Sequence, residues 1–160
     1  MPKSSTFHEI RENVEIPRLA VTTSCRLSAM WAAAFGDFDP IHYDNEYAVR
    51  HNLPGTIVNG RLKVALLVRL LTSFAGPSGR LKRLPARHQG MTGLGELLTL
   101  RGVVTRKYVE GGENFVHLEI WAENPKGERT AAWLRHGLLS LKTRRAQGGS
   151  VSPLRSEHRL

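Results

Sequence analysis

The sequence predicts an α+β fold in which an antiparallel sheet curls around one long buried helix. Residues 60–74 carry apolar side chains around most of a helical circumference, and such a helix is normally enclosed by other structure. The pattern after them alternates between apolar and polar residues, which is typical of half-buried strands. One buried helix followed by about four strands of this kind favours a sheet wrapped around that helix.

The elements before the long helix are marked by their capping residues. A short strand is expected at 16–21, and the polar run 22–24 supplies N-cap candidates for a helix that Gly36 ends in a left-handed conformation. Asp44 is placed to cap a second, short helix. These segments therefore precede the long helix as small, separate elements.

The second half of the chain is dominated by strands. Gly76-Pro77 stops the long helix. Alternation or enrichment in Leu, Val, Thr and Trp predicts three strands, at 97–107, 115–123 and 130–141, and a weaker one at 81–89. Turn-forming residues separate the three stronger strands, as in consecutive hairpins.

Composition limits the class of protein. A length of 160 residues fits one domain, which we expect at 16–142, between an N-terminal extension (1–15) and a basic, disordered tail (143–160). The single cysteine, Cys25, permits neither an intrachain disulfide nor a cysteine metal site. Because no apolar run resembles a signal or a membrane span, a cytoplasmic protein without membrane contact is expected.

The net charge of +9 is compatible with nucleic acid, a membrane surface or a phosphate-bearing small partner. No nucleic-acid-binding motif is present, so we expect no nucleic-acid partner. Arg80, Lys82, Arg83 and Arg87 are candidates for contacting phosphates, although a solvated strand face explains them as well.

The chemistry of the chain is concentrated in the run Gly36-Asp37-Phe38-Asp39-Pro40-Ile41-His42-Tyr43-Asp44. Asp37 and His42 are separated by a loop that Pro40 stiffens, so their side chains can converge. A carboxylate beside an imidazole can activate water and transfer a proton near neutral pH. From the spacing alone, a turn cap and a surface histidine are the more common explanation of such a pair.

This run resembles the hydratase signature of MaoC-like proteins and R-specific enoyl-CoA hydratases, Gly-Asp-x-Asn-Pro-Ile-His-x-Asp, with Asp39 at the usual Asn position. The similarity continues through 47–48, 54–55 and 58–60 and covers roughly residues 15–142. The resemblance implies a hot-dog fold and a cofactor-free, metal-free enzyme that hydrates an enoyl thioester or dehydrates a 3-hydroxyacyl thioester.

The same resemblance assigns roles to individual residues. Asp37 and His42 are expected to activate the water. Gly60, at the start of the buried helix, is expected to offer its backbone N–H to the thioester oxygen. Pro40 and Ile41 of the motif are expected to contact the substrate, which is carried by coenzyme A or an acyl carrier protein.

Asn59-Gly60-Arg61 departs from the family pattern, which usually has His-Gly followed by an apolar residue. Asn59 and Arg61 are therefore expected to bind substrate, and Arg61, taken as buried in the helix, to pair with an anion. Val58-Asn59 and Ala75-Gly76-Pro77 also resemble, more weakly, the small MaoC-like subunits of steroid side-chain-degrading hydratases.

These departures leave alternatives open. The chain is expected to form a homodimer, a larger hot-dog oligomer, or a mixed assembly with a second MaoC-like chain. It would then be a hydratase, a partner-dependent acyl-CoA-binding subunit or a hot-dog thioesterase.

Overall fold

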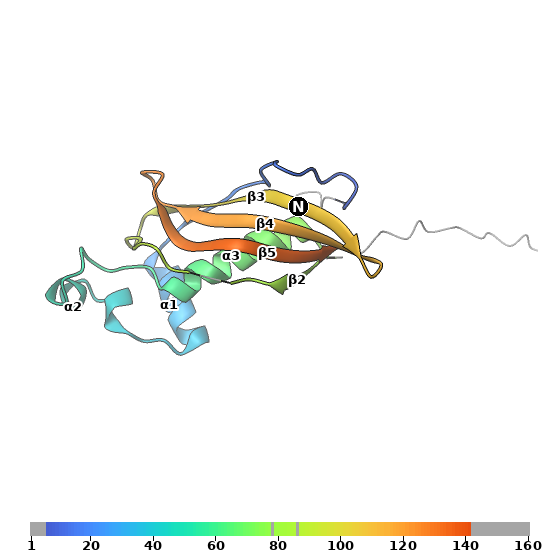
Figure 1. Cartoon of the computed structure of the whole chain (residues 1–160). Helices are drawn as coiled ribbons and strands as arrows, with labels where there is room; N and C mark the ends of the chain where they lie inside the picture. The colour runs from blue at the N-terminus through green and yellow to red at the C-terminus, as the bar shows by residue number, and fades with distance from the viewer. Residues whose placement is uncertain (1–5, 78, 86, 142–160) are drawn as a thin grey trace, which may run out of the picture.

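A five-stranded antiparallel sheet with the order β1-β3-β4-β5-β2 curls over helix α3 (Figure 1). The computed structural model describes residues 6–77, 79–85 and 87–141, with the backbone alone for 131–136. The elements are β1 (Leu19–Thr22), α1 (Cys25–Phe35), the 3-10 turn η1 (Pro40–His42), α2 (Asn45–Arg50), α3 (Gly60–Ala75), β2 (Gly79–Arg83), β3 (Leu97–Glu110), β4 (Glu113–Glu123) and β5 (Arg129–Leu141). The predicted α+β architecture is confirmed.

The core lies between α3 and the concave face of the sheet. Leu67 and Leu71 of α3 are fully buried, and they belong to one cluster with fully buried side chains from β3, β4 and β5: Leu98, Leu100, Leu118, Ile120 and Leu139. This packing accounts for the apolar circumference of the helix. None of the helices in the described part of the chain is long and apolar enough to cross a membrane.

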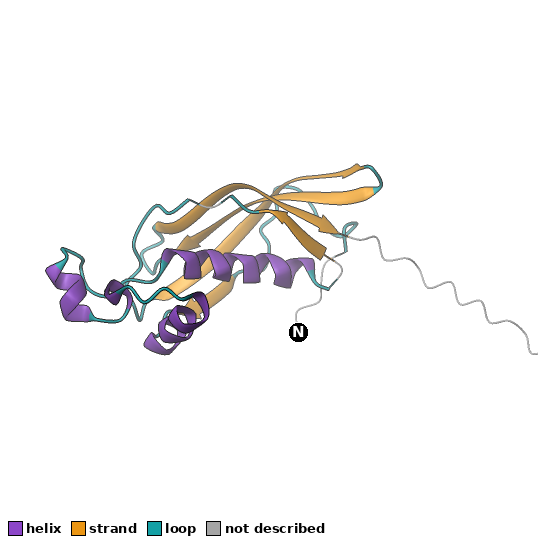
Figure 2. Cartoon of the chain, turned by 90° about the horizontal axis from the view of Figure 1, so that it is seen from below, coloured by secondary structure: helices purple, strands orange, loops and turns teal. Residues whose placement is uncertain are grey.

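The predicted caps of the helices are present. Ser24 Oγ accepts a hydrogen bond from the Leu27 amide at the start of α1, and Gly36 ends that helix at φ 75°. Asp44 Oδ1 accepts from the Tyr47 amide at the start of α2. These short elements gather at the end of α3 where that helix begins (Figure 2).

The largest differences from the predicted boundaries are at the two edge strands, β1 and β2. β1 begins at Leu19 rather than at residue 16, because Pro17 interrupts the run, and the expected strand at 81–89 ends at Arg83. The chain beyond Arg83 leaves the sheet edge and returns as a loop past the start of α3. Alternation alone could not distinguish that loop from a strand.

Buried Lys63 holds this returning loop. Its side chain on α3 is 2% exposed, and Nζ donates to the carbonyls of Gly90 at 2.8 Å and Thr130 at 3.0 Å. The Gly90 amide donates in turn to the Thr130 carbonyl. Burial lowers the pKa of Lys63 to about 8, since desolvation disfavours the charged form. The loop is thus fixed to α3 and to the start of β5.

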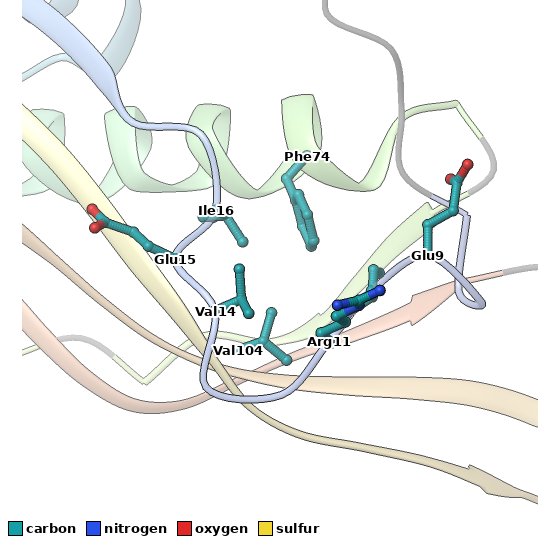
Figure 3. A pocket seen from close by; sticks show the side chains of 8 residues that line it. Glu9, Arg11, Val14, Glu15, Ile16, Phe74 and Val104 are labelled. Atoms are coloured by element: carbon teal, nitrogen blue, oxygen red, sulfur yellow. The ribbon is translucent and has the colours of Figure 1, made fainter.

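The segment 6–16 packs against β3 instead of lying apart from the domain. The Asn13 amide donates to the Val104 carbonyl, and the Ile16 amide to the Gly102 carbonyl. Ile10 is buried in the main core, and a small pocket of about 150 Å³ lies between this segment, Phe74 and Val104 (Figure 3). The expected boundaries at residues 16 and 142 remain predictions, and the expected tail lies outside the described residues.

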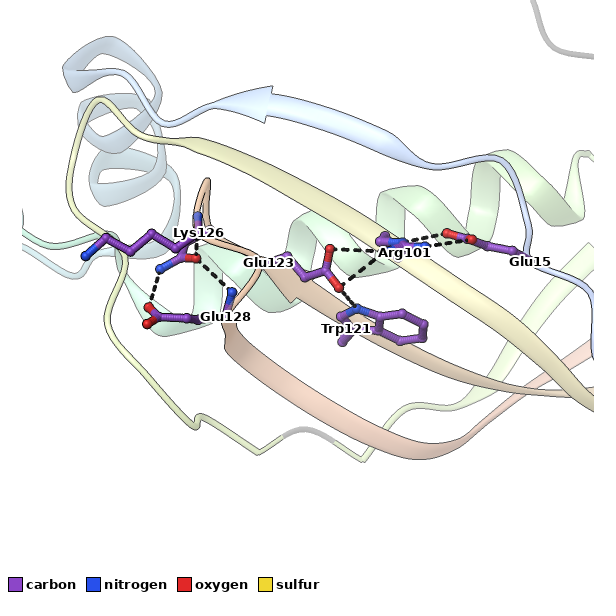
Figure 4. Close-up of polar contacts among 7 residues, drawn as sticks. Glu15, Arg101, Trp121, Glu123, Lys126 and Glu128 are labelled. Atoms are coloured by element: carbon purple, nitrogen blue, oxygen red, sulfur yellow. Dashed lines mark hydrogen bonds and ion pairs between the residues drawn. The ribbon is translucent and has the colours of Figure 1, made fainter.

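An arginine on β3 joins this segment to the outer face of the sheet. Arg101 forms two hydrogen bonds with Glu15, at 2.6 and 2.8 Å, and two longer ones with Glu123, at 3.3 and 3.5 Å (Figure 4). Trp121 Nε1 donates to the same Glu123. The hydrogen bond from Arg101 lowers the pKa of Glu15, so this carboxylate stays ionised.

Candidate active site

An open pocket of about 580 Å³ lies at the N-terminal end of α3. The loop after α1, the turn η1, the first turn of α3 and the loop after β2 all reach it. Its lining consists of Phe35, Gly36, Asp37, His42, Asn59, Gly60, Arg61 and His88. The structure therefore brings together five of the seven residues predicted for the site: Asp37, His42, Asn59, Gly60 and Arg61.

His42 is held by its backbone and by one ring nitrogen. Asp39 caps η1 by accepting from the Ile41 amide, and the Ser28 hydroxyl donates to the His42 carbonyl. His42 Nδ1 lies 2.8 Å from the carbonyl oxygen of Ile57. A carbonyl can only accept, so Nδ1 carries the hydrogen and Nε2 of the neutral ring is an acceptor. The ring thus presents the tautomer required of a general base.

The Asp37 carboxylate is fixed by hydrogen bonds to both oxygens. Asn59 Nδ2 donates to Oδ2 at 2.7 Å, and the Asp39 amide approaches Oδ1 at 3.4 Å. The Asn59 hydrogen bond is the largest cause of a lowered Asp37 pKa, because a donor stabilises the charged form. Asp37 is therefore a carboxylate near neutral pH.

Asn59 caps α3 with the other end of its side-chain amide. Its Oδ1 accepts from the amides of Arg61 at 2.8 Å and Leu62 at 3.3 Å, as expected for an N-cap residue. Within the part of the chain that the structure describes, the N–H of Gly60 has no acceptor. Among the described residues, the first turn of α3 therefore leaves Gly60 N–H without an acceptor in the pocket that Asp37 also lines.

The remaining predicted residues are placed differently. Pro40 and Ile41 are half-buried in η1 and do not line the pocket. Arg61 is exposed, so the expectation of a buried guanidinium is wrong: in the first turn of α3, Leu62 and Lys63 are buried, whereas Arg61 lines the open pocket. Its guanidinium lies over the Phe35 ring, 5.0 Å from the centroid, and Phe35 stacks on Trp31.

Sequence reasoning missed His88 and Phe35 as lining residues. His88 lies within the segment predicted as a strand, where an isolated histidine has no periodic neighbour to mark it. Only the path of the loop after β2 brings it to the pocket. Across the described residues, no group of three or more His, Cys, Asp or Glu side chains is positioned to hold a metal ion.

Residues 8–122 match the family described as the MaoC like domain. The chain belongs to the MaoC-like domain family. Its fold is similar to R-hydratase PhaJ1 from Pseudomonas aeruginosa, with a TM-score of 0.77, 19% identity and 86% of each chain covered. The (R)-hydratase from A. caviae involved in PHA biosynthesis matches with a TM-score of 0.74 and 19% identity, over 83% of this chain and 98% of that chain.

A third similar structure is a complex of two different chains. The ChsH1-ChsH2 complex from Mycobacterium tuberculosis matches with a TM-score of 0.71 and 23% identity, over 82% of this chain and 98% of that chain. No curated protein matches the sequence. These likenesses confirm the predicted hot-dog fold of this MaoC-like chain.

Proposed function

We propose that this MaoC-like chain hydrates a trans-2-enoyl thioester to a 3-hydroxyacyl thioester, or catalyses the reverse dehydration, with coenzyme A as the carrier. The observation that carries the proposal is the arrangement at the start of α3. An ionised carboxylate (Asp37), an imidazole with a free acceptor nitrogen (His42) and an unoccupied amide N–H (Gly60) line one pocket. Membership of the MaoC-like family supports the same chemistry.

Each group has a defined task in the hydration. Asp37 and His42 Nε2 hold the water, and one of them accepts its proton as the oxygen forms a bond to C3. The electron pair of the C2–C3 double bond moves toward the thioester carbonyl, and the carbonyl oxygen of the thioester gains negative charge. Gly60 N–H donates to that oxygen, aided by the helix dipole. The proton is then delivered to C2, so the net reaction is the addition of water across the C2–C3 double bond.

A partner-dependent subunit is the second candidate function. The pocket of the single chain is open to solvent, and one structural relative is a complex of two chains. In this alternative, the chain would bind part of the acyl-CoA and would convert substrate only in a complex with a second MaoC-like chain. A thioesterase finds less support, because Asp37 and His42 lie within the hydratase signature.

The test is turnover of a panel of trans-2-enoyl-CoAs that differ in chain length and include an alicyclic member. Asp37→Asn and His42→Ala should each lower kcat by about 100-fold or more, the effect typical of a positioned acid–base group. Loss of the conjugated enoyl absorbance measures the rate, and circular dichroism checks the fold.

Asp39→Asn is the matched control. It makes the same change of carboxylate to amide two positions away, and an Asn side chain can still cap η1. Its activity should stay near that of the wild type. Near-normal turnover in Asp37→Asn would contradict the assigned role, and a wild type inactive on the whole panel, with and without a second MaoC-like chain, would overturn the function.

A further inference from the structure

The side chain of His88 lies directly against Gly60. A Cβ atom built on Gly60 would be 2.8 Å from His88 Cε1, 2.9 Å from Nδ1 and 3.2 Å from Nε2. These three atoms are contiguous in the imidazole ring and lie at nearly equal distances, so a face of the ring, on its Nδ1–Cε1–Nε2 side, packs over the Gly60 Cα. Only glycine allows the ring to approach this closely.

The direction of that contact places His88 in front of the helix. In an α-helix the Cα–Cβ bond tilts toward the N-terminus, so the space a Gly60 side chain would occupy lies ahead of the first turn. The free N–H groups of a helix also point there, and an anionic oxygen binds there. The His88 ring, with both of its nitrogens on the side next to Gly60, thus borders the place where Gly60 N–H would hold an oxygen.

Among the described residues, both donors at this place lack a hydrogen-bond partner. Asn59 already satisfies the amides of Arg61 and Leu62. In the part of the chain that the structure describes, neither the Gly60 N–H nor the exposed His88 ring forms a hydrogen bond. A neutral imidazole always carries one N–H. Two free donors therefore border the same small volume.

The backbone that carries His88 is held in place. Gly90, two residues later, is fixed to Lys63 and to Thr130 by hydrogen bonds of 2.8 and 3.0 Å. Val58 of the segment leading into α3 donates to the Thr92 carbonyl at 2.8 Å. The loop is thus fixed to α3 at Gly90 and to the segment before α3 at Thr92, and these contacts position the ring.

We propose that His88 is a catalytic residue whose ring N–H donates a second hydrogen bond to the thioester oxygen held by Gly60 N–H. The inference rests on the proposed function and adds one participant to it. The oxygen gains charge as water adds to C3, so a donor fixed beside it stabilises the transition state more than the substrate. No bond to His88 forms or breaks in this role.

The test compares two replacements of His88. Phe keeps an aromatic ring against Gly60 but removes the donor, so His88→Phe should lower kcat/KM for the best enoyl-CoA of the panel by about 100-fold, the loss typical of one oxyanion donor. His88→Gln retains an N–H and should lose much less. His8→Phe makes the same change on an exposed histidine outside the pocket and should be without effect.

A spectroscopic measurement separates this role from a structural one. An aryl enoyl thioester such as 4-(dimethylamino)cinnamoyl-CoA absorbs at longer wavelength when its carbonyl is polarised by hydrogen bonds. The red shift on binding should shrink in His88→Phe and persist in His88→Gln. Gly60→Ala should shrink it as well, because the new methyl group displaces the ring.

The outcomes distinguish the two proposals. If the wild type hydrates enoyl-CoA and His88→Phe keeps both its rate and its red shift, His88 has no catalytic role and the proposed function stands. If Phe and Gln lower the rate equally while the red shift is unchanged, the role is structural and the inference is wrong. A wild type without turnover or probe binding would overturn both proposals.

Discussion

Asn59 links the two halves of the site through one amide group. Its Nδ2 holds the Asp37 carboxylate, and its Oδ1 caps the helix that presents Gly60 N–H. The side chain is 4% exposed, so its position is fixed by packing. It therefore sets the position of the carboxylate relative to the free amide, and its role in substrate binding stays a prediction.

Two substitutions separate the tasks of Asn59. Asn59→Ser can still cap α3 but is too short to reach Asp37 at the same time, so kcat should fall by about 10-fold, the equivalent of one charge-assisted hydrogen bond, while Tm changes little. Asn59→Ala should lose the same activity and also about 1 kcal/mol of stability through the lost cap.

Kinetics and thermal unfolding of both variants measure these effects. The KM should rise less than kcat falls, because Asn59 acts through Asp37. An Asn59→Ser protein that retains full kcat would show that Asp37 needs no positioning partner.

At the scale of elements, α3 contributes leucine side chains to the core, is capped by Asn59, and contains the buried Lys63. The ammonium of Lys63 reaches the carbonyls of Gly90 and Thr130 across the face of the helix. Its charged form is disfavoured by burial, whereas the unfolded chain solvates it fully. The connection between α3 and the loop after β2 is thus sensitive to pH in the alkaline range.

The sign of this pH dependence follows from proton binding. Between pH 8, near the folded pKa of Lys63, and about 10.4, its unfolded value, the unfolded chain binds more protons. Stability from this group therefore rises with pH across that window, by on the order of 3 kcal/mol in total.

Lys63→Met removes the titration. The difference in unfolding free energy between wild type and Lys63→Met, from urea denaturation between pH 7 and 10, should shift in favour of the wild type as pH rises. Other titrating groups cancel in that difference. A difference that stays constant would mean that Lys63 is better solvated than its burial indicates.

Elements with local signals could be predicted from the sequence, and those set by distant contacts could not. The caps at Ser24, Asp44 and Gly36, like the apolar circumference of α3, are properties of neighbouring residues. The exit of the chain from β2 at Arg83 depends on Lys63, which binds the loop from α3. Since that loop carries His88, the site could be predicted around Asp37 and His42 but not on its opposite side.

At the scale of the whole molecule, large apolar side chains are exposed on the chain between α1 and α2, which also supplies one side of the pocket. Met30, Phe35, Phe38 and Tyr43 are 60, 45, 62 and 55% exposed; the first two lie on α1, Phe38 on the loop after it, and Tyr43 directly after η1. A group of this kind beside a binding site is typical of a surface that a partner covers. We therefore expect the chain to assemble through this end.

Light scattering of the purified protein should give at least twice the chain mass of 17.9 kDa, or the chain should gain mass and activity with a second MaoC-like protein. Phe38→Lys should weaken assembly because it places a charge in the apolar group. Val109→Lys, at a position 61% exposed on the far hairpin, is the control. A monomer indifferent to any MaoC-like partner would contradict this expectation.

The segment 6–16 has a consequence for how the sheet opens. It extends the edge that β1 begins, since Val104 of β3 exchanges two backbone hydrogen bonds with Val14 and Asn13. The Val104 amide can exchange with deuterated solvent only when this segment detaches or the domain unfolds. Its exchange rate therefore records how often the edge of β3 becomes available as a template for another strand.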